Sequence, residues 1–272
     1  MHDRYVNPLC TRYAGRTMQH IYSDDNKFST WRRLWVALAE SEQELGLPIT
    51  DEQIRELRAH ITDIDYDYAA AREHEVRHDV MAHVLTYGAC CPEAKPILHL
   101  GATSCYVGDN TDIILMREAL EQIRSLLVNV IQALADFAEA HKAEPTLAYT
   151  HFQAAQPTTV GKRATLWTQD LLMDLEQLEF QLGNLKLLGC KGTTCLTATS
   201  RRSSRSSRRS AKRWAFPART PSAARPIRAR WTFRCCRCCP ASRRAPRSFP
   251  ATSACCPTSK RWTSRSRAAR SA

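Results

Sequence analysis

The sequence predicts an all-α protein: a small N-terminal helical domain, then the start of a bundle of long helices, then a disordered basic tail. Apolar residues recur at spacings of three and four through most of residues 31–188, as they do along one face of an α-helix. Two of these runs are about 30 residues long, and helices of that length need partners to cover them. Beyond residue 195 the periodicity stops and aliphatic residues almost vanish.

The charge of the chain is divided between two parts. The net charge is +12, yet all 27 acidic residues precede residue 180, and 21 of the 39 Lys and Arg residues lie within 196–272. Residues 1–195 are therefore acidic overall. The average charge of the whole chain, which would ordinarily indicate a nucleic-acid or membrane-surface partner, is misleading here.

The cysteines and the apolar segments predict the compartment. No apolar signal segment precedes the 12 Cys residues, and no apolar stretch approaches the roughly 20 residues that span a bilayer. We therefore expect free thiols, a cytoplasmic location and no membrane contact.

An extended N-terminal segment and two helices are expected first. Residues 1–18 are polar and predict an extended segment that carries Arg12 and Tyr13. Ser29 or Thr30 is the expected cap of the first helix, which ends at the glycine and proline of GLP. A short helix then begins after a threonine cap at residue 50, followed three positions later by glutamine.

The next helical pattern, residues 66–87, contains two motifs. One is RHDVMAH, which begins at Arg77. The other is H-E-x-x-H, formed by His74, Glu75 and His78, which on a single helix places two imidazoles on zinc. Glu93 is a conceivable third ligand. The alternative is an ordinary charged helix without a metal, and we expect no metal.

The stretch HLGATSCYVGDNTD, which begins at His99, combines small residues and hydroxyls with the start of a long helix. Such a turn can bring donors to an anionic group, although ordinary turns have the same composition. Asn110 or Thr111 is the expected helix cap. The candidate donors are those of Gly101, Thr103 and Ser104.

The two long helices are expected at residues 112–142 and 158–188, each roughly 45 Å long at 1.5 Å per residue. Between them His151 lies in a loop beside Thr150 and Gln153. A loop histidine can titrate near neutral pH and reach a ligand, which makes it a candidate for proton transfer.

Several of these motifs occur together in a known order. In that order and at similar spacing the sequence resembles the adenylosuccinate lyase family of the fumarase and aspartase superfamily, over residues 1 to about 195. The motifs are SDDNKFSTWRRLW at 23–35, GLPITDEQI at 46–54, RHDVMAH at 77–83, HLGATSCYVGDNTD at 99–112, THFQAAQPTTVGKR at 150–163 and GCKGTT at 189–194.

The resemblance implies a function and a set of site residues. The family eliminates fumarate from succinylamino purine nucleotides, as a homotetramer, without a metal or organic cofactor. His151 would be the general acid that protonates the departing nitrogen. Thr103 and Ser104 would bind a carboxylate of the succinyl group. Arg12 and Tyr13 would bind the phosphate of the nucleotide. The substrate pocket would be lined by Arg77, His78 and Asp79.

The base of the family has no match in this sequence. In the family it is a serine within a Ser-Ser-x-Met-Pro-x-Lys-x-Asn loop, beyond the second long helix. The last Met here is Met173, so no Met-Pro follows residue 195. We therefore expect the 272-residue chain to be truncated relative to the family and inactive as written.

The tail, residues 196–272, has the composition of a GC-rich gene read in the wrong frame, and a frameshift is our interpretation. Its low aliphatic content predicts disorder. Two alternatives are a nucleic-acid-binding extension, based on RRSSRSSRR at 201–209, and a metal site at CCRCC.

The predicted organisation is therefore a helical domain at 1–109, a partial bundle at 110–195 and the tail at 196–272. The predicted function is that of an adenylosuccinate lyase. The alternatives are a non-enzymatic protein that binds nucleic acid through its tail, and another fumarate-releasing lyase of the superfamily.

Overall fold

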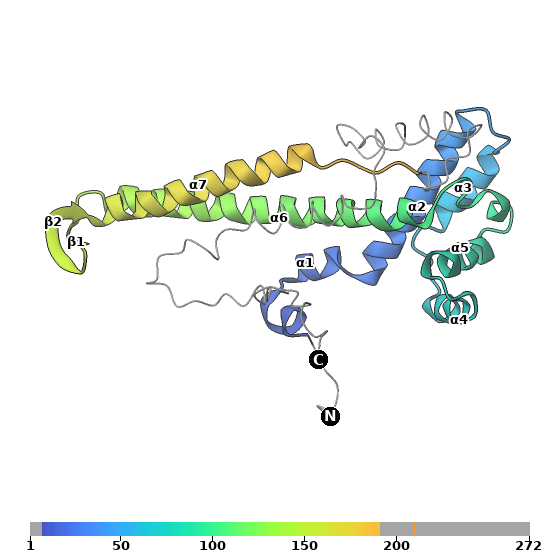
Figure 1. Ribbon diagram of the computed structural model, residues 1–272, viewed down its shortest axis with the longest axis horizontal. Helices are drawn as coiled ribbons and strands as arrows, with labels where there is room; N and C mark the ends of the chain where they lie inside the picture. Colours follow the sequence, from blue (N-terminus) through green and yellow to red (C-terminus); the bar gives the residue numbers. More distant parts are fainter. Residues whose placement is uncertain (1–6, 191–208, 210–272) are drawn as a thin grey trace, which may run out of the picture. The chain divides into compact units, whose positions relative to one another are not determined.

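The computed structural model describes residues 7–190 and Arg209, and this part of the chain is mostly helical (Figure 1). The all-α prediction is confirmed, with one β-hairpin in addition. The elements in order are η1 Leu9–Tyr13, α1 Arg16–Ile21, α2 Asp24–Gln43, α3 Asp51–Ala59, α4 Tyr66–Val76, α5 Asp79–Cys90, η2 Lys95–Ile97, α6 Ser104–Ala140, β1 Pro145–Thr150, β2 Gln153–Thr159 and α7 Val160–Asn184.

The starts of α2 and α3 are both capped by hydroxyl side chains. Ser23 accepts a hydrogen bond from the Asn26 amide at 3.2 Å, so α2 begins well before the expected caps Ser29 and Thr30, which are buried inside it. The prediction of that start was wrong because two aspartates after Ser23 already favour a helix N-terminus there. For α3 the prediction is confirmed, since Thr50 and Gln53 form a reciprocal capping box.

The main core lies where α2, α3, α5 and the first turns of α6 meet. Leu34, Trp35, Leu57 and Tyr106 are almost completely buried in it. The segment after α7, residues 185–190, returns to this core and buries three further apolar side chains there. We call this assembly the N-terminal core.

Residues 121–184 form a second region, the arm, which comprises most of α6, the hairpin and α7. The two long helices lie side by side (Figure 1). They approach closely at Gly161, where a Cβ atom would lie 2.3 Å from the carbonyl oxygen of Ala138. The strands β1 and β2 pair antiparallel, with Thr150 opposite Gln153.

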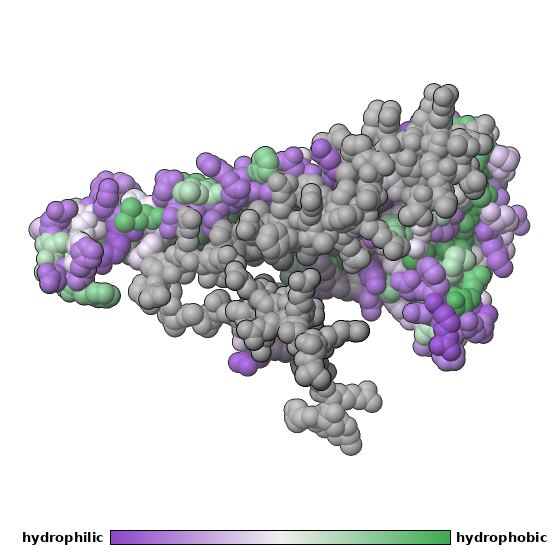
Figure 2. All heavy atoms as spheres, in the orientation of Figure 1, coloured by the Kyte–Doolittle hydropathy of each residue, from purple (hydrophilic) through white to green (hydrophobic). Residues whose placement is uncertain are grey.

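The arm leaves large apolar side chains exposed. Leu126 and Phe137 on α6, and Leu166 and Phe180 on α7, are each between 41% and 59% accessible. Figure 2 shows hydrophobic residues interspersed with hydrophilic ones along the two long helices. Among the described residues no helix combines the length and the apolar character that a membrane crossing requires.

The tail lies outside the described residues, apart from Arg209. The predicted disorder, the nucleic-acid-binding interpretation of 201–209 and the CCRCC metal alternative all fall on undescribed residues. The predicted domain boundaries and the frameshift stay predictions.

Candidate active site

The RHD segment lies at a break between two helices. Arg77 has a left-handed backbone, with φ of 55°, and ends α4. His78 caps α5, where its Nδ1 accepts a hydrogen bond from the Met81 amide at 3.4 Å, and Asp79 is the first residue of that helix. A left-handed arginine is uncommon, because its Cβ crowds the backbone. All three side chains of the RHD segment are exposed, so they are accessible to a ligand.

This break corrects the prediction of one helix over residues 66–87. It also removes the basis of the zinc alternative. That alternative needs His74 and His78 on one face of one helix, but α4 ends at Val76. His78 belongs to the N-terminus of α5 instead.

The hydroxyl-rich stretch begins the long helix α6. Thr103 is the N-cap, and Ser104 is the first helical residue. The Thr103 side chain makes no capping hydrogen bond, so its hydroxyl is not used to close the helix. The expected caps Asn110 and Thr111 are wrong, because both residues are buried inside α6. The first amides of α6 and two hydroxyls thus lie together, an arrangement suited to an anionic group.

His99, at the start of this stretch, contacts Trp35 of α2. Its Nδ1 accepts a hydrogen bond from the indole N–H of Trp35 at 2.9 Å. Burial, and to a lesser extent the charge of nearby His78, lower the pKa of His99 to about 4. The electrostatic influence of His78 indicates that the RHD segment lies near His99. Sequence reasoning did not single out His99, because a histidine before a turn gives no sign of a buried partner.

Residues 185–190, which return to the core after α7 and which we call the return segment, are hydrogen-bonded to the first turns of α6. Asn110 accepts a hydrogen bond from the Leu188 amide at 2.7 Å, and its own amide lies 3.4 Å from the Leu188 carbonyl. The Thr103 amide donates to the Cys190 carbonyl at 3.1 Å. These contacts explain why the expected cap Asn110 is buried: it binds another part of the backbone.

His151 lies far from these groups. It occupies the turn between β1 and β2, where His151 and Phe152 have φ values of 52° and 61° and are both exposed. The hairpin follows the C-terminal end of the 37-residue helix α6, whereas Ser104 begins it, a separation along the helix of about 55 Å (Figure 1). Within one chain, therefore, His151 does not share a site with Thr103 or Ser104.

Arg12 and Tyr13 belong to η1, close to the N-terminus. Both are exposed, and the Arg12 guanidinium lies 5.8 Å from the centre of the Tyr13 ring. Among the described residues no hydrogen bond, ion pair or ring contact joins this pair to the RHD segment or to the start of α6. The N-terminal segment that was predicted to be extended is partly helical, through η1 and α1.

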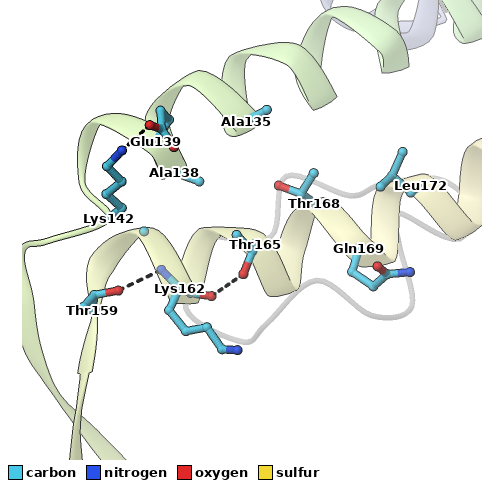
Figure 3. Close-up of a pocket in the computed structure, with 11 residues that line it drawn as sticks. Ala135, Ala138, Glu139, Lys142, Thr159, Lys162, Thr165, Thr168, Gln169 and Leu172 are labelled. Atoms are coloured by element: carbon cyan, nitrogen blue, oxygen red, sulfur yellow. Dashed lines mark hydrogen bonds and ion pairs between the residues drawn. The ribbon is translucent and has the colours of Figure 1, made fainter.

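A groove of about 540 Å³ lies elsewhere, between the end of α6 and the start of α7 (Figure 3). Lys142 pairs with Glu139 on one wall, and the Lys162 amide donates to the Thr159 hydroxyl at 3.1 Å on the other. No predicted site residue lines it.

Comparisons with known proteins agree with these motifs. A family model described as lyase matches residues 22–219. Adenylosuccinate lyase of Saccharomyces cerevisiae is 54% identical over 196 residues, which are 71% of this chain and 41% of that protein. Adenylosuccinate lyase of Schizosaccharomyces pombe is 49% identical over 193 residues, covering 70% of this chain and 40% of that protein.

The fold also has a counterpart among solved structures. The crystal structure of a fumarate lyase from Mesorhizobium sp. BNC1 superposes with a TM-score of 0.75 at 21% identity, over 84% of this chain and 55% of that one. The chain spans about two fifths of the length of the curated relatives that it matches.

Proposed function

The chain belongs to the lyase family, and from that premise we propose that it is a carbon–nitrogen lyase that acts as an adenylosuccinate lyase. The reaction is elimination of fumarate from adenylosuccinate, giving AMP, and from the related succinyl-carboxamide ribotide. The observation that carries this proposal is the 54% identity, over 196 residues, with the adenylosuccinate lyase of Saccharomyces cerevisiae. We assign the enzyme to purine nucleotide biosynthesis and to the cytoplasm.

The start of α6 is the proposed carboxylate site. Thr103 and Ser104 supply hydroxyls beside the first amides of a long helix, where a negative charge is favoured. Such donors also stabilise the charge that builds up on a carboxylate when the neighbouring C–H proton is removed. We assign Arg77, His78 and Asp79 to the lining of the substrate pocket.

The other groups supply the phosphate site and the acid. Arg12 and Tyr13 are exposed on η1, and we assign them to the nucleotide phosphate. His151 is exposed in the hairpin turn, and we assign it the proton that the departing nitrogen accepts.

The separation of His151 from the carboxylate site supports a site shared between subunits. The two lie at opposite ends of α6, so one chain cannot place both on a single small molecule. A homotetramer in which the hairpin of one chain meets the N-terminal core of another would satisfy this geometry. The exposed apolar side chains of the arm support such an assembly.

The catalytic base has no assigned residue in these 272 residues. We propose that this chain alone releases no fumarate, since losing a base lowers a rate by about 10²- to 10⁴-fold. We further propose that another reading frame of the coding DNA, after residue 194, specifies the Met-Pro-x-Lys loop and the remaining helices. We call that product the restored chain.

Fumarate release from adenylosuccinate tests the proposal. The restored chain should be active, and His151→Ala should lower its kcat by about 10²- to 10⁴-fold. His141→Ala is the matched control, because His141 is also a partly exposed histidine of the arm but pairs with Glu144 at 2.7 Å. An active 272-residue chain would refute the missing base, and an unaffected His151→Ala enzyme would refute the assigned acid.

A further inference from the structure

We propose that Trp35 is a positioning residue, whose indole N–H fixes His99 as the neutral Nε2–H tautomer and makes it a hydrogen-bond donor instead of a proton-transfer group. The inference deepens the proposed function, on which it rests for the use of His99. It concerns a contact between α2 and the turn before α6.

The direction of the hydrogen bond determines the tautomer. An indole nitrogen can only donate, so the Nδ1 atom that it contacts at 2.9 Å has to accept and carry no proton. In a neutral imidazole the single hydrogen is then on Nε2. The two rings stand almost perpendicular, at 88° with centroids 6.0 Å apart, which directs the indole N–H toward the edge of the imidazole.

The same contact opposes protonation of His99. A proton on Nδ1 would face the indole hydrogen, and the bond would be lost. Burial and the charge of nearby His78 act in the same direction and lower the pKa of His99 to about 4. Trp35 is 2% exposed, so water cannot easily replace the lost bond.

The backbone of His99 has a conformation that surrounding contacts have to hold in place. Its φ is 59°, in the left-handed region that residues with a Cβ rarely adopt. Such a conformation persists only where surrounding contacts hold it, and it frequently marks a functional position. Within residues 7–190 the Nε2 atom has no hydrogen-bond partner. It is therefore available to donate to an oxygen atom of an anionic ligand.

A neighbouring tryptophan provides a matched control. Trp31 lies one helical turn earlier on α2 and is also 2% exposed, but its indole nitrogen has no hydrogen-bond partner among the described residues. Replacing either indole by phenyl removes similar core volume. Only the Trp35 change removes a donor from His99.

Solid-state NMR of the 272-residue chain, labelled with ¹⁵N-histidine, reads the tautomer directly and does not require a monodisperse sample. The His99 signals are assigned by their loss in His99→Asn, whose side-chain oxygen can still accept from Trp35. We expect an unprotonated Nδ1 and a protonated Nε2 at every pH from 5 to 8. A protonated Nδ1 in that range would overturn the proposal.

The variants add a second criterion. Trp35→Phe should produce a mixture of tautomers and protonation of His99 at a higher pH, whereas Trp31→Phe should leave the His99 signals unchanged. Identical His99 spectra in wild type and Trp35→Phe would overturn the role of Trp35. If Trp35→Phe does not fold, the wild-type spectrum still decides, because its tautomer is observed without a variant.

The readout is independent of turnover. A neutral Nε2–H His99 in a restored chain without lyase activity would leave the tautomer intact and refute the proposed function. An active restored chain with a cationic His99 would refute only the present inference.

Discussion

The N-terminal core and the arm are built from the same kind of helix but differ in what covers them. Leu34 and Leu57 in the core are completely buried, whereas Leu166 and Phe180 in the arm are 59% and 55% exposed. In the core, apolar side chains of the return segment pack against the helices in addition. In the arm, among the described residues, the two helices pack mainly against each other. The comparison shows that periodicity predicts a helix but does not identify its neighbours, which for the arm we propose to be other subunits.

The largest effect on stability is expected when the same amide-to-acid change is made in the core and in the arm. Asn110→Asp places a carboxylate at a position that is 1% exposed and removes donors to the Tyr106 and Leu188 carbonyls. An unpaired buried charge of this kind should lower the free energy of unfolding by about 3–5 kcal/mol.

The matched change in the arm is Gln132→Glu, which also converts an amide to an acid but at an exposed position. It should change stability by no more than about 0.5 kcal/mol. Urea denaturation followed by circular dichroism measures both. Similar losses for the two variants would contradict the contrast between core and arm.

The arm has one tightly packed point of its own. At Gly161 a Cβ would lie 2.8 Å from the backbone of Lys142 as well as against Ala138, and backbone cannot move aside as a side chain can. Gly161→Ala should therefore lower stability by about 1–3 kcal/mol through overpacking.

Gly183, on the same helix α7, is the control, because a Cβ atom added there would have no other atom within 4 Å. Gly183→Ala should raise stability by about 0.5–1 kcal/mol, since alanine favours a helix more than glycine. Thermal unfolding of the pair should give shifts of opposite sign, and two positive shifts would contradict the close approach of α6 and α7.

The dependence of stability on pH should come from the core. Burial raises the pKa of Glu42 to about 8, so the stability that this group contributes is complete below about pH 4.5 and is lost as the pH rises toward 8. Burial, with the charges of Arg32 and Lys27, lowers the pKa of His83 to about 4, and His99 behaves alike. Their contributions are complete above about pH 6.5 and are lost as the pH falls through 4.

Between pH 6.5 and 8 only Glu42 among these three changes its contribution. Stability should therefore fall over that range by about 1–2 kcal/mol, reduced somewhat by partial exposure of the group. Glu42→Gln should abolish the fall while preserving the shape of the side chain. Denaturation midpoints at pH 6.5 and 8 provide the measurement, and an unchanged fall in the variant would exclude Glu42 as its source.

The sequence predicted the elements better than their ends. The Thr50 capping box was predictable because both partners lie within four residues. The start of α6 was not, because Asn110 resembles a cap but instead binds Leu188, 78 residues away. The break at Arg77 was equally hidden, since helical spacing of apolar residues continues across it and a left-handed φ leaves no mark in composition.

For the candidate site, too, the sequence predicted single residues better than their arrangement in space. Local motifs singled out Thr103, Ser104 and His151, and the structure places the first two at a helix start and the third in a hairpin turn. They could not reveal that α6 separates His151 from the others, because this depends on where a helix begins and ends. Nor could they reveal the pairing of His99 with Trp35, which joins residues 64 positions apart.

The smallest expected effect on folding is at the exposed face of the arm. Phe180→Lys replaces a side chain that is 55% exposed and should change the stability of a single chain by no more than about 0.5 kcal/mol. It should nevertheless weaken self-association, since exposed apolar surface is what would hold chains together. Sedimentation velocity compares the variant with wild type, and unchanged association would exclude this face from the interface.

The shared site is the central claim, and mixing two inactive variants of the restored chain tests it most directly. One carries His151→Ala and retains an intact N-terminal core; the other carries Thr103→Val with Ser104→Ala and retains an intact hairpin. After they are mixed and reassembled, fumarate release from adenylosuccinate should reappear, because some sites combine the intact core of one chain with the intact hairpin of another. A mixture as inactive as its two components would contradict the account.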